Sequence, residues 1–171
     1  MSKRNAILAA AIQRFSRNGF QGTAVADLSA LTGAATGTIF HHFRNKEDIF
    51  LQVLQQVRET IQEQFDLHRR QRLSHNGLAM VEEAIAFYLH LAATLEDQFL
   101  ILHRHDPYQM AETNPVCRAH LESIYTGLLE IFEEGIQQGL QDGSVRVDDP
   151  RKTAMLLFAI VDGIVRLNTY Q

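Results

Sequence analysis

Residues 23–50, TAVADLSALTGAATGTIFHHFRNKEDIF, constrain the fold of this chain more than any other segment. Apolar residues recur at helical spacing on both sides of Gly33, which predicts two short helices joined by a tight turn. The second of these helices is expected over residues 35–41, and its outer face carries only Thr36, Gly37 and Thr38. Side chains this small and polar do not fill a core, so this helix is predicted to lie close against another molecule.

Two short helices around a tight turn form a helix-turn-helix, whose second helix lies in the major groove of DNA. The charge distribution agrees with this interpretation. Residues 1–72 hold ten Lys and Arg against six Asp and Glu, a net +4, whereas residues 73–171 hold six against fourteen, a net −8. A basic N-terminal part on an acidic remainder is typical of a DNA-binding head attached to a body that does not bind DNA.

The remainder of the chain predicts helices and no strands. Asn18-Gly19 is expected to end a first helix over residues 3–18, and Thr23 to cap the second. Asn45 is expected to cap a long fourth helix, and Asp106-Pro107 is interpreted as a helix stop. No segment of useful length alternates between apolar and polar residues, so the fold class is all-α. Further helices are predicted over residues 78–93, 95–105, 115–140 and 150–170, the last two opened by Asn114-Pro115 and Asp149-Pro150.

Several classes of protein are disfavoured by what the sequence lacks. Cys117 is the single cysteine, which excludes an intramolecular disulfide and suits a reducing compartment. No apolar run has the length of a membrane span or the position of a signal peptide, so we expect a soluble, cytoplasmic protein with no membrane partner. No catalytic cluster and no phosphate-binding glycine loop is present, so we expect neither an enzyme nor a cofactor.

The run GTIFHHF at residues 37–43, followed by Asn45-Lys46-Glu47, resembles the DNA-binding domain of TetR-family transcriptional regulators. The resemblance covers about residues 3–55. It implies a DNA-binding domain over residues 1–48 and a helical ligand-binding and dimerisation domain over residues 49–171. It also implies a set of DNA contacts, which in this sequence are Thr23, Ala35, Thr36, Gly37, Thr38, Phe40, His41, His42, Arg44 and Lys46.

The chemistry of these residues suits DNA. Gly37 allows close approach to the duplex, and the threonines offer a hydroxyl and a methyl to a phosphate or a thymine. Lys46, beside the free N–H groups of the fourth helix, is expected to form a phosphate site. The chain departs from the family where Ala35 replaces the serine that would cap the third helix, and where Phe40 replaces tyrosine. Fewer phosphate contacts, or compensation by Arg44, are expected.

The resemblance further implies a homodimer formed by the last two helices and a pocket for a small-molecule effector. Residues 115–140 and 150–170 carry broad apolar faces that suit an interface between two copies. A pocket with apolar walls and a few polar tips suits a hydrophobic or amphipathic effector. The residues predicted to line the pocket are Phe87, His90, Phe99, His103, Tyr125 and Phe158. The aromatic residues among them are also compatible with an ordinary hydrophobic core.

The sequence therefore predicts a DNA-binding regulator, most simply a repressor that binds a palindromic operator as a homodimer and releases it when the effector binds. Two alternatives stay open. One is a helical enzyme or small-molecule-binding protein without DNA binding. The other is a metal-responsive regulator, because Cys117 and His120 lie three residues apart, although no metal site is predicted.

Overall fold

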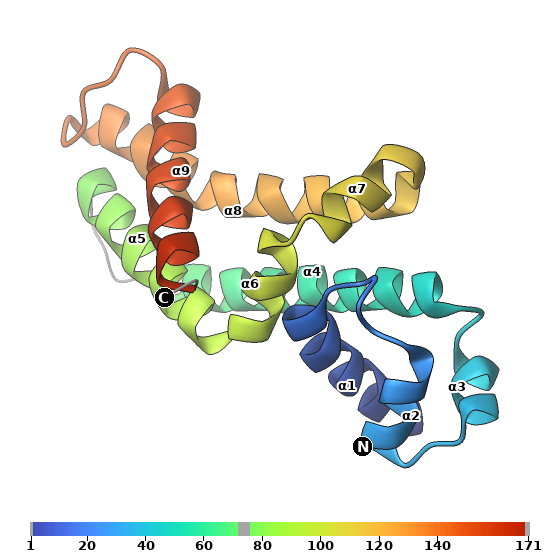
Figure 1. Ribbon diagram of the computed structural model, residues 1–171. Helices are drawn as coiled ribbons and strands as arrows, with labels where there is room; N and C mark the ends of the chain where they lie inside the picture. Colours follow the sequence, from blue (N-terminus) through green and yellow to red (C-terminus); the bar gives the residue numbers. More distant parts are fainter. Residues whose placement is uncertain (1, 72–75, 170–171) are drawn as a thin grey trace. The chain divides into compact units, whose positions relative to one another are not determined.

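The computed structural model describes residues 2–71 and 76–169, and these residues form helices and no strands, which confirms the all-α prediction. In this part of the chain no single helix is both long and apolar enough to cross a lipid bilayer. The helices (Figure 1) are α1 (Lys3–Asn18), α2 (Val25–Thr32), α3 (Thr36–His42), α4 (Lys46–Gln71), α5 (Gly77–Thr94), α6 (Glu96–His103), α7 (Asp106–Thr113), α8 (Pro115–Asp142) and α9 (Pro150–Thr169).

The chain divides into two compact units. Unit 1 comprises Met1–Glu59 and Glu96–Leu121, and unit 2 comprises Thr60–Leu95 and Glu122–Gln171. The helices α4 and α8 each contribute residues to both units. These bounds differ from residue 48, where the sequence placed its domain boundary, and that functional division stays a prediction.

Unit 1 is built around the apolar face of α1. Phe15 is fully buried, and its ring meets the ring of Phe50 on α4 edge-on at 5.1 Å between centroids. Ile39 from α3 and Leu28 from α2 are also fully buried. The spacing of apolar residues along these helices therefore has a direct structural cause, because each stripe faces the same core.

Most of the predicted helix ends are confirmed. The Asn45 Oδ1 atom accepts a hydrogen bond from Asp48 N at 2.8 Å, and Asn114 and Asp149 cap α8 and α9 in the same way. Gly19 and Gly33 adopt positive φ angles of 74° and 66° after α1 and α2, a conformation that glycine adopts without strain.

One predicted cap is wrong, and one helix, α7, was not predicted. Ala24, and not Thr23, is the N-cap of α2, and its N–H donates to Asp27 Oδ2 at 2.8 Å. Asp106-Pro107 begins α7 instead of only ending the preceding helix. Proline suits the first turn of a helix because the N–H that it lacks would have no partner there. Residues 72–75, within the polar stretch at residues 69–77, lie outside the described residues, as does the end of the predicted last helix at residue 170.

In unit 1, α1 is joined to α6 and to the segment that follows it. The Ser16 hydroxyl donates to Asp97 Oδ1 at 2.7 Å. Arg104 donates from Nε to Ser16 O at 2.8 Å, and from its terminal nitrogen to Arg17 O. Because the last carbonyls of a helix have no partner within it, Arg104 stabilises the C-terminal end of α1.

In unit 2, a buried polar group joins α5 to α9. The Tyr88 hydroxyl donates to Asp162 Oδ1 at 2.7 Å, and Arg166 Nε donates to Asp162 Oδ2 at 3.1 Å. Asp162 and Arg166 lie four residues apart on α9, whereas Tyr88 lies 74 residues from Asp162 in the sequence. Burial, followed by the charge of Asp162, raises the pKa of Tyr88 far above its usual range, so its hydroxyl stays protonated.

Candidate DNA-binding site

The outer face of α3 is exposed, as the sequence predicts. Ala35, Thr36 and Gly37 are exposed, Thr38 is half-buried, and Phe40 keeps 48 % of its surface exposed. A Cβ atom added at Gly37 would meet no atom within 4 Å. No packing within the described chain therefore requires a glycine here, and its φ is not positive. The remaining reason for a glycine at this position is that it lets another molecule approach the helix closely.

The inner face of α3 fixes the helix to unit 1. Ile39 is fully buried, and Phe43, which follows the last turn, is 2 % exposed. The guanidinium of Arg4 lies over the Phe43 ring, with 5.7 Å from Cζ to the centroid. The short helix is therefore held by two apolar anchors, and its exposed face is presented from a fixed position.

Three further predicted DNA contacts lie at the end of α3 and just after it. The side chains of His41, His42 and Arg44 are exposed, and the two imidazole rings lie edge to face at 5.3 Å between centroids. The backbone N–H of Arg44 donates to Asp48 Oδ2 at 2.9 Å. This hydrogen bond fixes the backbone of Arg44 next to α4.

Lys46 has a structural role that the sequence did not indicate. Its ammonium donates to Phe20 O at 2.8 Å and to Thr23 O at 3.1 Å, and it lies 4.4 Å from the centroid of the Phe20 ring. An ammonium has three donors, and these carbonyls accept two of them. Lys46 thus holds the segment between α1 and α2, and its contact with a phosphate stays a prediction.

Thr23 is 1 % exposed, and its hydroxyl donates to Gly19 O at 2.8 Å. The hydroxyl therefore closes the turn between α1 and α2. The DNA contact predicted for Thr23 stays a prediction, and the structure assigns its side chain to the interior of unit 1.

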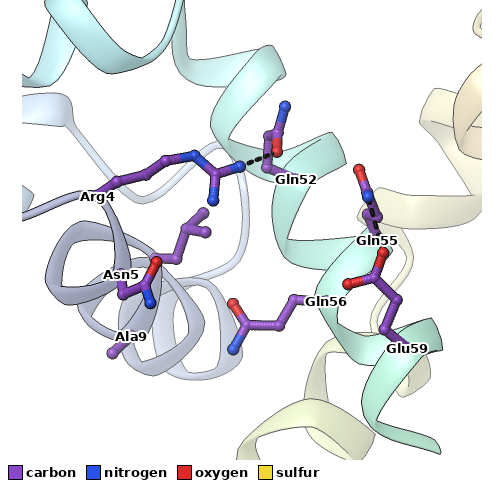
Figure 2. A pocket seen from close by; sticks show the side chains of 8 residues that line it. Arg4, Asn5, Ala9, Gln52, Gln55, Gln56 and Glu59 are labelled. Carbon is purple, nitrogen blue, oxygen red and sulfur yellow. Dashed lines mark hydrogen bonds between the residues drawn. The ribbon is translucent and has the colours of Figure 1, made fainter. Parts of the chain in front are cut away.

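A polar groove of about 390 Å³ lies between α1 and α4 in unit 1. Figure 2 shows Arg4 and Asn5 on α1 facing Gln52 and Gln56 on α4, with Arg4 donating to Gln52 Oε1. Its lining is rich in amides and charges. It therefore differs from the apolar pocket that the sequence predicts for an effector.

The residues predicted to line the effector pocket divide between the two units. Phe99 and His103 lie in unit 1, both buried, with ring centroids 6.1 Å apart. In unit 2 the rings of Tyr125 and Phe158 lie 6.1 Å apart. These pairs are neighbours, and their role in binding an effector stays a prediction.

The other two predicted pocket residues lie on α5 in unit 2. The Phe87 ring stacks on His68 at 4.2 Å between centroids, a contact that the sequence does not predict because no local spacing links the two residues. His90 is exposed, and its backbone carbonyl accepts a hydrogen bond from Thr94. The exposed position of His90 does not suit the wall of an enclosed pocket.

Among the described residues, no three His, Cys, Asp or Glu side chains gather closely enough to hold a metal ion. The Cys117 thiol is fully buried and donates to Pro107 O at 3.3 Å. Burial, together with the charge of Glu47, raises the pKa of this thiol to about 11. A thiol that stays protonated is a poor metal ligand and a poor nucleophile.

Comparison with known proteins agrees with this geometry. Residues 7–53 match the family model described as bacterial regulatory proteins, tetR family. The fatty acid metabolism regulator protein of Bacillus subtilis (strain 168) is 24% identical over 160 residues, which cover 93% of this chain and 79% of that protein. The HTH-type transcriptional repressor BepR of Brucella suis biovar 1 (strain 1330) is 31% identical over 139 residues, covering 76% and 66%.

The fold of a solved relative covers nearly the whole chain. The transcriptional regulator FadR of Bacillus subtilis, whose crystal structure is a complex with stearoyl-CoA, superposes with a TM-score of 0.71 at 21% identity, over 94% of this chain and 84% of that one. The exposed helix-turn-helix, the family match over it and the named relatives together identify a DNA-binding transcriptional regulator. The chain belongs to the TetR family of such regulators, which are not enzymes.

Proposed function

We propose that this chain is a repressor that binds a palindromic operator as a homodimer and releases it when a hydrophobic or amphipathic small molecule binds. The observation that carries the proposal is the exposed, small-residue face of α3, where Gly37 leaves open space. A helix with such a face can enter the major groove, which is about 12 Å wide. One of the relatives is named as a transcriptional repressor, which supports repression and not activation of transcription.

Phosphate contacts are assigned to positive groups beside α3. Arg44 is exposed at the end of α3, and Lys46 begins α4. Such contacts set the position of a protein on the duplex without reading its sequence. Replacing Arg44 by Ala is expected to weaken binding to all duplexes and to lower the log–log salt slope by roughly one. An unchanged slope would remove Arg44 from the phosphate contacts.

The homodimer is assigned chiefly to α9. Leu156, Ile160 and Leu167 are 65%, 60% and 69% exposed, and Met155 and Ile164 extend the same stripe. Ala159 is exposed within it, and a Cβ added at Gly163 would meet nothing within 4 Å. Small residues inside an exposed apolar stripe let a second helix approach closely. Along α8, all of which is described, only Val116 and Leu140 are exposed large apolar side chains.

Dimerisation would serve DNA recognition, because two copies of α3 about one DNA turn apart would read the two halves of a palindrome. The effector must then favour a dimer whose two copies of α3 do not fit adjacent major grooves. We assign the coupling to α4, which begins beside α3 in unit 1 and continues into unit 2.

Stearoyl-CoA is the first effector to test. It is bound in the Bacillus subtilis relative, and it is amphipathic, as the effector predicted for this chain is. Octanoyl-CoA is a matched control, because it keeps the coenzyme and shortens only the apolar chain.

The proposal is tested by selecting bound duplexes from random DNA with the purified full chain. The expected result is enrichment of a palindrome whose half-sites lie about ten base pairs apart, or a multiple of that distance. Stearoyl-CoA is expected to release the selected duplex in an anisotropy titration. No enrichment of any sequence would contradict the proposed function, whereas enrichment without release would contradict only the choice of effector.

A further inference from the structure

The side chains of α3 lack the groups that most often read bases. Arg and Lys bind guanine, and Asn and Gln bind adenine, through paired hydrogen bonds in the major groove. Residues 34–42, AATGTIFHH, contain none of these four residue types. If this helix reads DNA, it must do so by other contacts.

The exposed face of α3 offers methyl groups and one aromatic ring instead. Ala35 and Thr36 are exposed, and Phe40 is 48% exposed. Thr36 and Phe40 are four residues apart and therefore lie on the same face of the helix. Gly37 lies beside them with open space, so nothing on this face keeps the two side chains away from a groove floor. Ala, Thr and Phe are the residues whose apolar groups contact the C5-methyl of thymine.

The polar side chains of α3 do not change the interpretation that apolar groups of this helix contact thymine. The imidazole rings of His41 and His42, at the end of α3, lie edge to face against each other. Thr38 is half-buried. Thr36 therefore supplies the one exposed side-chain hydroxyl of the first turn, and its methyl group accompanies it.

We infer that α3 reads its operator half-site chiefly through the C5-methyl groups of thymines, so that A·T pairs occupy the positions facing Thr36 and Phe40. This inference rests on the proposed function, and it adds the chemical class of base pair that the site recognises. Specificity then comes from burying the C5-methyl groups of thymine, which G·C pairs lack.

Deoxyuridine tests the inference, because it differs from thymidine only by the missing C5-methyl. The selected duplex is synthesised with deoxyuridine at each half-site thymidine in turn, and its affinity for the full chain is measured by fluorescence anisotropy. Each contacted methyl that is removed is expected to weaken binding about fourfold, which is the effect of burying one methyl group. Deoxyuridine in the flanking DNA is the control and is expected to change nothing.

Thr36→Ser provides a matched change on the protein, since it removes one methyl and keeps the hydroxyl. The deoxyuridine penalty opposite residue 36 is expected to fall to about onefold in this variant, while the penalty opposite Phe40 persists. Thr36 is exposed, so the variant is expected to fold as the parent does.

The outcomes separate this inference from the function on which it rests. A selected duplex that binds equally well with deoxyuridine throughout both half-sites overturns the methyl readout and leaves DNA binding intact. A half-site made of G·C pairs at all positions facing α3 does the same. Failure to enrich any duplex overturns the proposed function, and the readout falls with it.

Discussion

The exposed faces of α3 and α9 both contain a glycine beside open space, yet they differ in every other respect. Around Gly37 the neighbouring side chains are small or polar apart from the Phe40 ring, and around Gly163 several exposed side chains are large and apolar. An apolar stripe excludes water well only against another apolar surface. A slim face with hydroxyl and methyl groups suits a groove lined with polar base edges. The side chains around an exposed helical glycine therefore indicate which kind of partner the face suits.

Each face is also supported by polar contacts on the inner side of its unit. Ser16 joins α1 to Asp97 on α6 and to Arg104 just after it, in the unit that carries α3. Tyr88 and Asp162 join α5 to α9 in the unit that carries the apolar stripe. The surfaces and their supports can therefore be changed separately, and the following predictions use that separation.

The largest effect is expected from Gly37→Leu. The leucine side chain enters open space, so the fold is expected to gain about 0.5–1 kcal/mol from better helix propensity. Close approach to the groove is lost, and operator affinity is expected to fall by on the order of 10³-fold, toward the non-specific level. Anisotropy and thermal melting measure the two effects. Retained affinity would show that α3 does not enter the groove.

Ile160→Glu is expected to separate the copies of the dimer. A charge placed in the middle of the α9 stripe loses apolar contacts and is desolvated, so dimerisation is expected to weaken by about 100-fold. Analytical ultracentrifugation measures this change. Leu89→Glu, at an exposed apolar position on α5, is the matched control and is expected to leave the dimer unchanged. Equal effects of both variants would remove α9 from the interface.

Tyr88→Phe is expected to lower the free energy of unfolding by about 2 kcal/mol, because it removes a hydrogen bond to a buried carboxylate. Urea denaturation measures this loss. Operator affinity per folded dimer is expected to change little, since Tyr88 is on neither exposed face. A large loss of affinity without a loss of stability would mean that Tyr88 acts in binding.

The same tyrosine predicts a dependence on alkaline pH. Its pKa is raised in the folded state, so its contribution to stability is complete below the unfolded pKa of about 10. This contribution is lost as pH rises above that value. The unfolding free energy of the parent is therefore expected to fall more steeply than that of Tyr88→Phe between pH 10 and 11, in denaturation curves measured at both pH values.

The smallest effect is expected from Arg104→Met, which removes two hydrogen bonds to the end of α1 and keeps most of the apolar stem. The cost is about 1 kcal/mol of stability, measured by thermal or urea unfolding. Arg104→Lys keeps the charge but cannot reproduce the two-pronged donor, so it is expected to behave like methionine. Full stability of the lysine variant would assign the effect to charge alone.

Local patterns predicted the helices well because their causes are local. The asparagine at position 45 and the glycine at position 33 act within a few residues, and both are confirmed. Asp106-Pro107 was misinterpreted because proline both ends one helix and begins the next, and the sequence alone does not distinguish these roles. Thr23 was predicted to cap α2, but its hydroxyl instead donates a hydrogen bond to the carbonyl of Gly19.

The site was predictable where the residues face outward and not where they depend on distant partners. The exposure of Thr36 and Gly37 followed from the helical pattern. The contact of Lys46 with the carbonyl of Phe20, 26 residues away, did not. Nor did the contact between Tyr88 and Asp162, since two residues 74 positions apart share no local periodicity.

The central claim, that α3 presents its small-residue face to the major groove, is tested most directly by following backbone amide resonances of the full-length protein while the selected operator duplex is added. We expect the largest shift changes on residues 35–44, and we expect Gly37→Leu to abolish them. Large changes elsewhere, with the amides of residues 35–44 unmoved, would contradict it.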